Sequence, residues 1–141
     1  MKYIGYLLFI LIQCTWGLGQ TLLGLVLFCI HRASPHTFYK GCVHTEWKMD
    51  GGISLGLFIF TPEGGGNSEW NSRLTVHEYG HAWQSLLLGP FYSIPGLASL
   101  CWSRMNYFQR MRREKNIPYS DFWTERWANW WGEKLTGRPS I

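Results

Sequence analysis

The chain is organised around one segment, His77-Glu78-Tyr79-Gly80-His81-Ala82-Trp83-Gln84-Ser85. In an α-helix, residues i and i+4 lie one above the other on the same face, so His77 and His81 can direct two imidazoles at one metal ion. Glu78 directly follows the first histidine, where a carboxylate can hold a water molecule beside that metal. The segment itself lacks a third ligand, which the rest of the chain has to supply.

A helix over residues 73–88 is predicted around this segment. Asn71 or Ser72 can cap its first turn, and Gly89-Pro90 ends it because proline cannot continue a helix. The two histidines therefore fall in the interior of the predicted helix, where the regular backbone maintains their spacing.

A second helix, over residues 121–136, is predicted to carry the third ligand. Glu125, Ala128, Asn129 and Gly132 fall on one face of it, and that face is small and polar. A carboxylate on a stripe of small residues can approach another helix closely. The amide one turn further on can bind the outer nitrogen of a ligand histidine. We therefore expect Glu125 to complete a three-ligand site with the two histidines.

Other interpretations of Glu125 remain open at this point. Asp121 and Glu133 are further carboxylates on the same predicted helix and are alternative ligands. Glu125 also suits an ordinary helix surface, where it would pair with Arg126 or Lys134. All of these carboxylates occur on one predicted helix of about four turns. Their positions in the folded structure therefore have to decide which of them reaches the histidines.

The two motifs together resemble a known group of enzymes. His77-Glu78-x-x-His81 followed by Glu125-x-x-Ala128-Asn129 is similar to the gluzincin metallopeptidases, and most similar to membrane-associated members related to the CAAX prenyl protease. Gly80 matches the glycine in the first motif of that group. Asn129 departs from the pattern, which usually has aspartate there, so the ligand histidine would be less basic. The resemblance covers the two motif helices and, at most, the strands ahead of them.

The resemblance implies a zinc ion (Zn2+) and hydrolysis of peptide bonds. Zinc would lower the pKa of a bound water and polarise the scissile carbonyl, while Glu78 would act as general base and pass the proton to the leaving amine. A group that stabilises the oxyanion is also expected, and Tyr119, Tyr107 and His44 are the candidates. The expected partners are a peptide or protein substrate and membrane lipid.

A β-hairpin over residues 42–60 is predicted ahead of the first motif. Residues 42–49 alternate in polarity, Asp50-Gly51-Gly52 is typical of a tight turn, and residues 53–60 form the return strand. The resemblance assigns this return strand to the edge of the cleft, where it would pair with an extended substrate. The residues expected at that edge are Ile53, Ser54, Leu55, Gly56 and Leu57.

A transmembrane helix is predicted at the N-terminus, because residues 3–30 carry no charge and are long enough to cross a bilayer. A secretory signal peptide is the rival interpretation, but the apolar run is too long and no cleavage site follows. The predicted organisation is α+β, with a transmembrane helix at 1–31 and a minimal zincin-like domain at 32–141.

Small and polar residues recur along this apolar run at helical spacing: Gln13, Gly17, Gln20, Thr21 and Gly24. In lipid such a stripe turns toward protein, because exposed amides are costly and small residues allow close approach. The stripe is predicted to pack either against the rest of this chain or against a second copy or another membrane partner.

Two later segments are predicted to lie at the membrane surface. Residues 86–102 are apolar but interrupted by glycine and proline, and a true second span would separate Glu125 from the histidines by the membrane thickness. A surface-lying or re-entrant course is therefore expected. Residues 103–115 are basic with interleaved apolar side chains, which favours a cytoplasm-facing membrane surface.

Composition excludes several other functions. The 141-residue chain has a net charge of only +4 and no nucleic-acid-binding motif, so no nucleic-acid partner is expected. Its four cysteines form no Cys-x-x-Cys pair, which argues against a thiolate zinc site or a disulfide framework.

Three functional hypotheses follow from the motifs. The first is a small membrane-anchored zinc peptidase. The second is a non-catalytic membrane protein with a structural zinc site, acting as an accessory subunit. An intramembrane protease of the site-2 type is a weaker third, because Glu69 and Arg73 precede the metal motif and the Leu-Asp-Gly signature of that group is missing.

Overall fold

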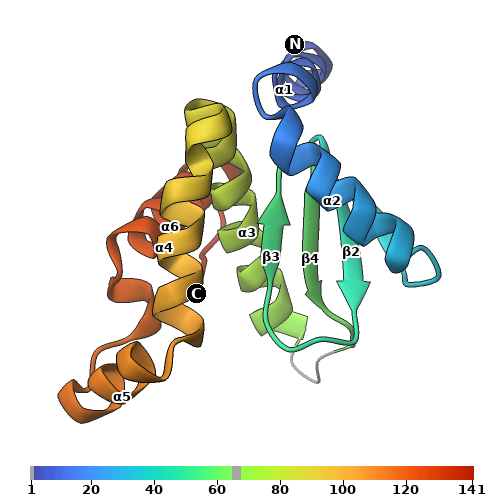
Figure 1. The fold of residues 1–141 in the computed structure, drawn as a ribbon. Helices are drawn as coiled ribbons and strands as arrows, with labels where there is room; N and C mark the ends of the chain where they lie inside the picture. The colour runs from blue at the N-terminus through green and yellow to red at the C-terminus, as the bar shows by residue number, and fades with distance from the viewer. Residues whose placement is uncertain (1, 65–67) are drawn as a thin grey trace.

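The charge-free N-terminal run forms two helices, α1 (Lys2–Thr15) and α2 (Leu18–Ile30), in the computed structural model, which describes residues 2–64 and 68–141 (Figure 1). The two helices are bent by 95° at the break between them. At a rise of 1.5 Å per residue each is about 20 Å long, shorter than the roughly 30 Å core of a bilayer. The single unbroken helix predicted for this run is therefore wrong, and the run is long enough to cross a bilayer only if the bent pair is counted as one span.

The polar residues of this run are buried against the rest of the chain. The Gln13 side-chain amide donates hydrogen bonds to the Ala82 carbonyl and the Ser85 hydroxyl, both at 2.8 Å. One helix later, the Gln20 amide donates to the Gly89 carbonyl at 3.0 Å. These bonds satisfy the NH2 groups of both amides, whereas their buried Oε1 atoms have no hydrogen-bond partner among the described residues. The bonds attach α1 to residues 82 and 85 and α2 to residue 89.

Two glycines allow the close packing of this N-terminal run. A Cβ at Gly24 would meet the Phe58 side chain at 2.7 Å, and one at Gly17 would collide with the Gln13 amide. Both glycines are buried. The stripe of Gln13, Gly17, Gln20 and Gly24 thus packs against the rest of this chain, which is the first of the two contacts predicted for it. The surface that a second copy would have needed is already occupied.

A four-stranded sheet follows, with β1 (His36–Tyr39), β2 (Cys42–Trp47), β3 (Ile53–Leu55) and β4 (Phe58–Pro62) in the order β1-β2-β4-β3. β1 pairs antiparallel with β2, and β3 pairs antiparallel with β4. β2 and β4 pair in parallel, however. The predicted hairpin over residues 42–60 is therefore wrong, because the strand after the Asp-Gly-Gly turn does not pair with the strand before it.

The predicted return strand is split by a turn at Gly56 and Leu57. Gly56 has φ +60°, and a Cβ there would meet the backbone nitrogen of Thr21 at 2.7 Å, so only glycine allows α2 to lie this close. The expected edge strand thus shrinks to Ile53–Leu55. This short β3 is one of the two edge strands of the sheet, and the chain then turns inward as β4.

The two motif helices are present with shifted ends. α3 (Ser68–Leu88) begins about a turn before the predicted start, so Asn71 lies inside the helix and donates instead to the Pro62 carbonyl at 3.1 Å. α6 (Trp123–Thr136) begins two residues after the predicted start at residue 121 and ends at the predicted residue 136. Gly137 follows with φ +69°, the left-handed conformation typical of a residue that ends a helix.

Between these helices the chain reverses direction. A short 3-10 turn, η1 (Gly89–Tyr92), leads into α4 (Ser93–Arg104), α5 (Asn106–Lys115) and the turn η2 (Tyr119–Asp121). α4 runs back in the direction opposite to α3, which returns the chain so that α6 packs along α3 (Figure 1).

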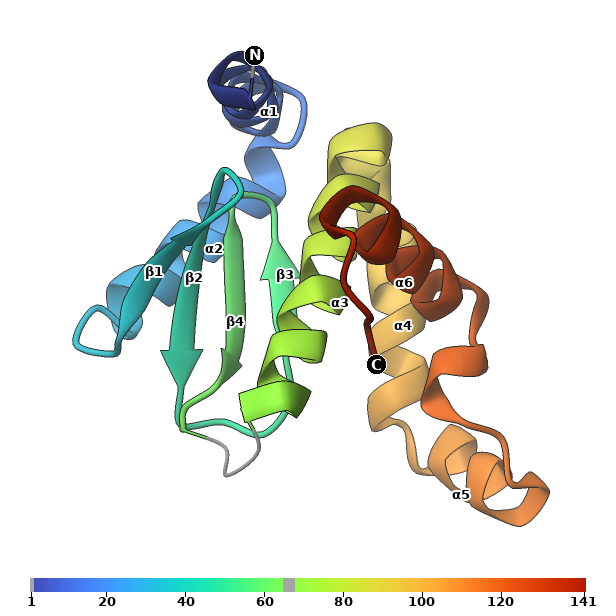
Figure 2. The ribbon, with the colours of Figure 1, turned by 180° about the vertical axis from the view of Figure 1, so that it is seen from behind.

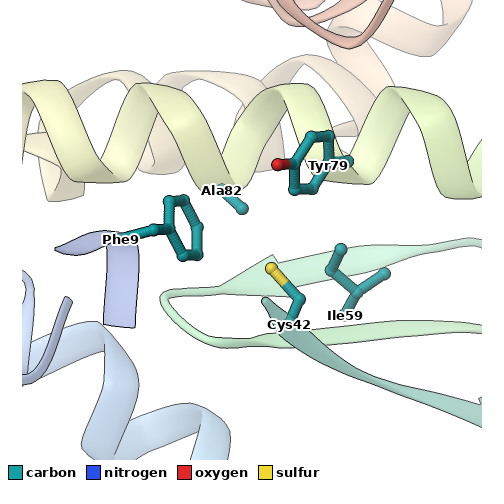
Figure 3. Packing of buried hydrophobic residues seen from close by; sticks show 5 residues of the cluster. All are labelled: Phe9, Cys42, Ile59, Tyr79 and Ala82. Carbon is teal, nitrogen blue, oxygen red and sulfur yellow. The ribbon is translucent and has the colours of Figure 1, made fainter. Parts of the chain in front are cut away.

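The sheet lies between α2 on one face and α3 on the other (Figure 2). Alternate residues of β4 point to opposite faces, as expected for a strand. Ile59 joins Tyr79 and Ala82 of α3 in a buried cluster that Phe9 and Cys42 complete (Figure 3). The neighbouring β4 residues face α2 and make a second cluster of Trp47, Phe58 and Phe60. α3 is thereby fixed against the face of the sheet opposite α2.

By length and composition, one helical stretch of the described chain, Glu69–Arg104, could cross a membrane, or two if the bent α1–α2 pair counts as one span. Only 28% of its most apolar 18-residue window is buried in the protein. A substantial apolar surface in this part of the molecule therefore remains uncovered.

Candidate metal centre

His77, His81 and Glu125 converge on one point in the interior. The His77 Nε2 and His81 Nε2 atoms lie 3.1 and 3.4 Å from Glu125 Oε2, and 3.2 Å from each other. All three side chains are buried. A tetrahedral zinc site with ligand bonds of about 2.0–2.1 Å has edges of about 3.3–3.4 Å between ligand atoms. The three side chains therefore have the spacing of ligands around one metal ion.

Close packing of α6 against α3 produces this convergence. A Cβ at Gly80 would collide with the Ala128 carbonyl oxygen, and one at Gly132 would collide with the Val76 carbonyl oxygen. The two helices therefore touch backbone to backbone at two glycines. Glu125 lies one turn before Ala128 on the face of α6 that meets α3, and it is fully buried there. The stripe of small residues thus brings the carboxylate to the histidines.

Two side-chain amides determine which nitrogen of each histidine carries the proton. Asn129 Oδ1 lies 2.6 Å from His77 Nδ1, and Gln84 Oε1 lies 2.8 Å from His81 Nδ1. The NH2 group of Gln84 donates to the Thr124 carbonyl at 2.8 Å, which leaves its oxygen to accept from the histidine. Both Nδ1 atoms thus donate a proton, and both Nε2 atoms present lone pairs to Glu125.

The Glu125 carboxylate is divided between two environments. Its Oε1 atom accepts hydrogen bonds from the Ser99 and Thr124 hydroxyls, whereas its buried Oε2 atom faces the two histidines without a hydrogen-bond partner. Three groups with electron pairs to donate therefore face one another, and a cation bound between them would offset their repulsion.

The residues fit a metal ion in this role. Two imidazole nitrogens and one carboxylate oxygen form a common ligand set for zinc and other borderline divalent metals, and outer partners that fix the tautomer are typical of such sites. Among the residues that the structure describes, the group has three members, which is the ligand number of sites with one open position.

Glu78 lies next to this group and faces a cavity. It is 4% exposed, and a Cβ at Gly52 would collide with its carboxylate, so glycine at position 52 makes the room that Glu78 occupies. Burial raises the pKa of Glu78 to about 7, with His77 acting against this shift and Glu125 adding to it. A carboxyl group that ionises near neutral pH is suited to taking up and releasing a proton.

The cavity has a volume of about 360 Å³ and lies between β3 and α4. Glu78 and His81 line its inner end, and the free edge of β3 forms one wall. One face of α4 forms the opposite wall, where the lining residues are spaced by three and four positions: Ser93, Gly96, Leu97, Leu100, Ser103 and Arg104. The cavity is therefore bounded by residues of both β3 and α4.

The three candidates for oxyanion stabilisation, Tyr119, Tyr107 and His44, lie in different parts of the structure. Tyr119 lines the cavity, and its hydroxyl lies 3.4 Å from the Ser99 hydroxyl, which itself binds Glu125. Tyr107 is 69% exposed on α5, and His44 bonds Thr61 within the sheet. Neither Tyr107 nor His44 lines the cavity. Only Tyr119 is placed near the metal-site residues.

Sequence reasoning missed Gln84 and Tyr92. Gln84 lies three residues after His81, one turn along the same helix face, and that spacing was the available signal. The Tyr92 hydroxyl lies 3.1 Å from His81 Nδ1, beside Gln84, and burial raises the pKa of Tyr92, so it remains neutral. No local pattern marks Tyr92, because the turn at η1 brings it back to the site.

Searches for relatives returned nothing: the chain matches no protein-family model, no curated protein and no solved structure. The assignment of function therefore depends on the geometry of the site.

Proposed function

We propose that this protein is a small membrane-associated zinc peptidase in which Glu78 is the general base. The observation that carries the proposal is the convergence of His77, His81 and Glu125 on one point beside an open cavity, with Glu78 buried at its inner end. The ligand set, the fixed histidine tautomers and the adjacent carboxyl group are the parts that metal-assisted hydrolysis requires.

Zinc held by these three side chains would lower the pKa of a bound water and polarise the scissile carbonyl. Glu78 takes the proton from the attacking water and transfers it to the leaving amine. Tyr119 lines the same cavity and is the side chain best placed to donate a hydrogen bond to the developing oxyanion.

The cavity walls favour an extended peptide as substrate. β3 lies at the sheet edge and, within residues 2–64 and 68–141, pairs with β4 alone, so its other edge can bind an added strand. Leu97 and Leu100 on the opposite wall offer apolar contacts to alternate side chains of such a strand. Backbone pairing with β3 would therefore bind the substrate, and contacts between its side chains and α4 would determine which substrate residues are preferred.

Membrane association is supported by apolar side chains on one side of the molecule. α2 and α4 lie on the near side in Figure 1 and on the far side in Figure 2, flanking β3. Burial of such a surface in the boundary of a bilayer is favourable without any helix crossing it. The exposed apolar residues of α1, α2, η1 and α4 are Tyr3, Ile4, Leu7, Leu8, Leu11, Leu18, Leu22, Leu23, Leu25, Val26, Ile30, Phe91, Ile94, Leu97 and Leu100.

The alternative is a non-catalytic membrane protein with a structural zinc site. A structural site is closed by a fourth protein ligand, whereas the group here has three members among the described residues. A cavity that reaches Glu78 and His81 also serves no purpose in a purely structural site. These two observations favour the peptidase.

The experiment for this proposal combines lipid binding with proteolysis. The zinc-loaded protein is expected to float with lipid vesicles in a density gradient and to cleave members of a mixed peptide library, detected by mass spectrometry. Chelation should stop cleavage without releasing the protein from the vesicles, and added zinc should restore cleavage. A zinc-loaded protein that floats but cleaves no peptide would support the structural alternative, and one that remains unbound would contradict membrane association.

A further inference from the structure

The segment after α6 folds back along that helix. Gly137 ends α6 in a left-handed conformation, and the chain then turns toward α3 (Figure 2). The backbone N–H and the hydroxyl of Ser140 both donate to Glu133 Oε1, at 3.1 and 2.7 Å. Ser140 is 6% exposed. Residues 138–141 are thus attached to α6 by a defined contact.

The same segment reaches the metal centre through Asn129. The Asn129 NH2 group donates to the backbone oxygen of Ile141 at 2.8 Å, while its Oδ1 atom lies 2.6 Å from His77 Nδ1. A side-chain amide has one accepting end and one donating end. Because the Asn129 NH2 group donates to the Ile141 backbone oxygen, Asn129 Oδ1 faces His77 and accepts the proton on its Nδ1 atom.

We propose that residues 138–141 act as a positioning strap for the ligand His77. Without the Ile141 oxygen, the Asn129 amide is free to turn over and present its NH2 group to Nδ1. That orientation favours the tautomer protonated on Nε2, whose Nε2 atom has no lone pair for a metal beside Glu125 and His81. A carboxylate at position 129 would not need the strap, since both of its oxygens accept. The inference rests on the proposed metal site but not on peptidase activity.

The test is a cycle of four proteins: the wild type, a form ending at Gly137, Asn129→Asp, and Asn129→Asp ending at Gly137. Zn2+ affinity is measured by competition with a chelator. Removal of the strap should weaken zinc binding about 10- to 100-fold in the asparagine protein, the range found for partners of ligand histidines. In the aspartate protein the same removal should change the affinity less than about threefold.

Two controls separate orientation from general destabilisation. Ile141→Ala keeps the backbone oxygen and should bind zinc like the wild type. Glu133→Ala removes the acceptor of the Ser140 hydrogen bonds without shortening the chain. It replaces the truncation in the zinc-affinity comparison if the truncated form does not fold. Equal loss in the asparagine and aspartate backgrounds, or no loss in either, would overturn the strap. A wild type that binds no zinc would instead remove the metal site and the proposed function together.

Discussion

Glu78→Gln is expected to abolish peptide cleavage while zinc remains bound. Glutamine has the shape of glutamate but cannot take up a proton, so the water loses its base. Losses of about 10²- to 10⁴-fold in kcat are usual when a general base is removed. Gly52 leaves room for the side chain at position 78, and glutamine fits there as glutamate does. The measurement is the rate of cleavage of a library-derived peptide, with zinc content determined on the same sample.

Glu114→Gln is the matched control, because Glu114 is exposed on α5 and takes no part in the site. It should cleave at the wild-type rate. Full activity in Glu78→Gln would mean that another group accepts the proton, and the proposed mechanism would then be wrong even with zinc in place.

Gly80→Ala is expected to destabilise the protein and to lower its zinc affinity sharply. The new methyl group would collide with the Ala128 carbonyl oxygen, so α6 must move away from α3 and take Glu125 with it. Overpacking of this kind typically costs about 1–3 kcal/mol, more than the roughly 1 kcal/mol that alanine gains over glycine in a helix. Denaturant unfolding measures the stability, and chelator competition measures the zinc affinity.

Gly19→Ala is the control for this substitution. Gly19 lies in α2 with no neighbouring atom within 4 Å of an added Cβ, so alanine should leave zinc affinity unchanged and stability equal or slightly higher. If Gly80→Ala bound zinc as tightly as Gly19→Ala, the close contact of α3 and α6 would not be what positions Glu125.

The residues that come together at the site could be predicted from short-range sequence pattern. The spacing of His77 and His81 is a property of one helix, and Glu125 was marked by the small residues beside it on another. The placement of both on facing helices follows from Gly80 and Gly132, which allow backbone contact. The role of zinc and of Glu78 in catalysis remains a prediction.

The pairing of the strands could not be predicted in the same way. Alternating polarity in residues 42–49 and 53–60 is equally compatible with a hairpin and with parallel pairing of β2 and β4. The choice depends on Gly56, whose turn against α2 splits the second strand. That contact joins segments far apart in the sequence, so no local pattern reveals it.

The bend in the N-terminal run, residues 3–30, likewise depends on contacts with distant residues that a local sequence pattern does not reveal. Its composition is that of a membrane span, yet Gln13 and Gln20 bond to backbone carbonyls of Ala82 and Gly89, sixty-nine residues away in each case. These bonds fit a chain that bends by 95° between them. Polar residues at helical spacing predicted a contact with protein, but not the bend that the contact requires.

The most direct measurement is the zinc content of the purified protein beside that of His81→Ala. The wild type is expected to contain about one zinc ion per chain, because three buried side chains present their electron pairs to one point. The variant lacks one of these ligands and should contain almost none after dialysis against a weak chelator. Equal zinc in both proteins, or none in the wild type, would contradict the metal centre on which the account depends.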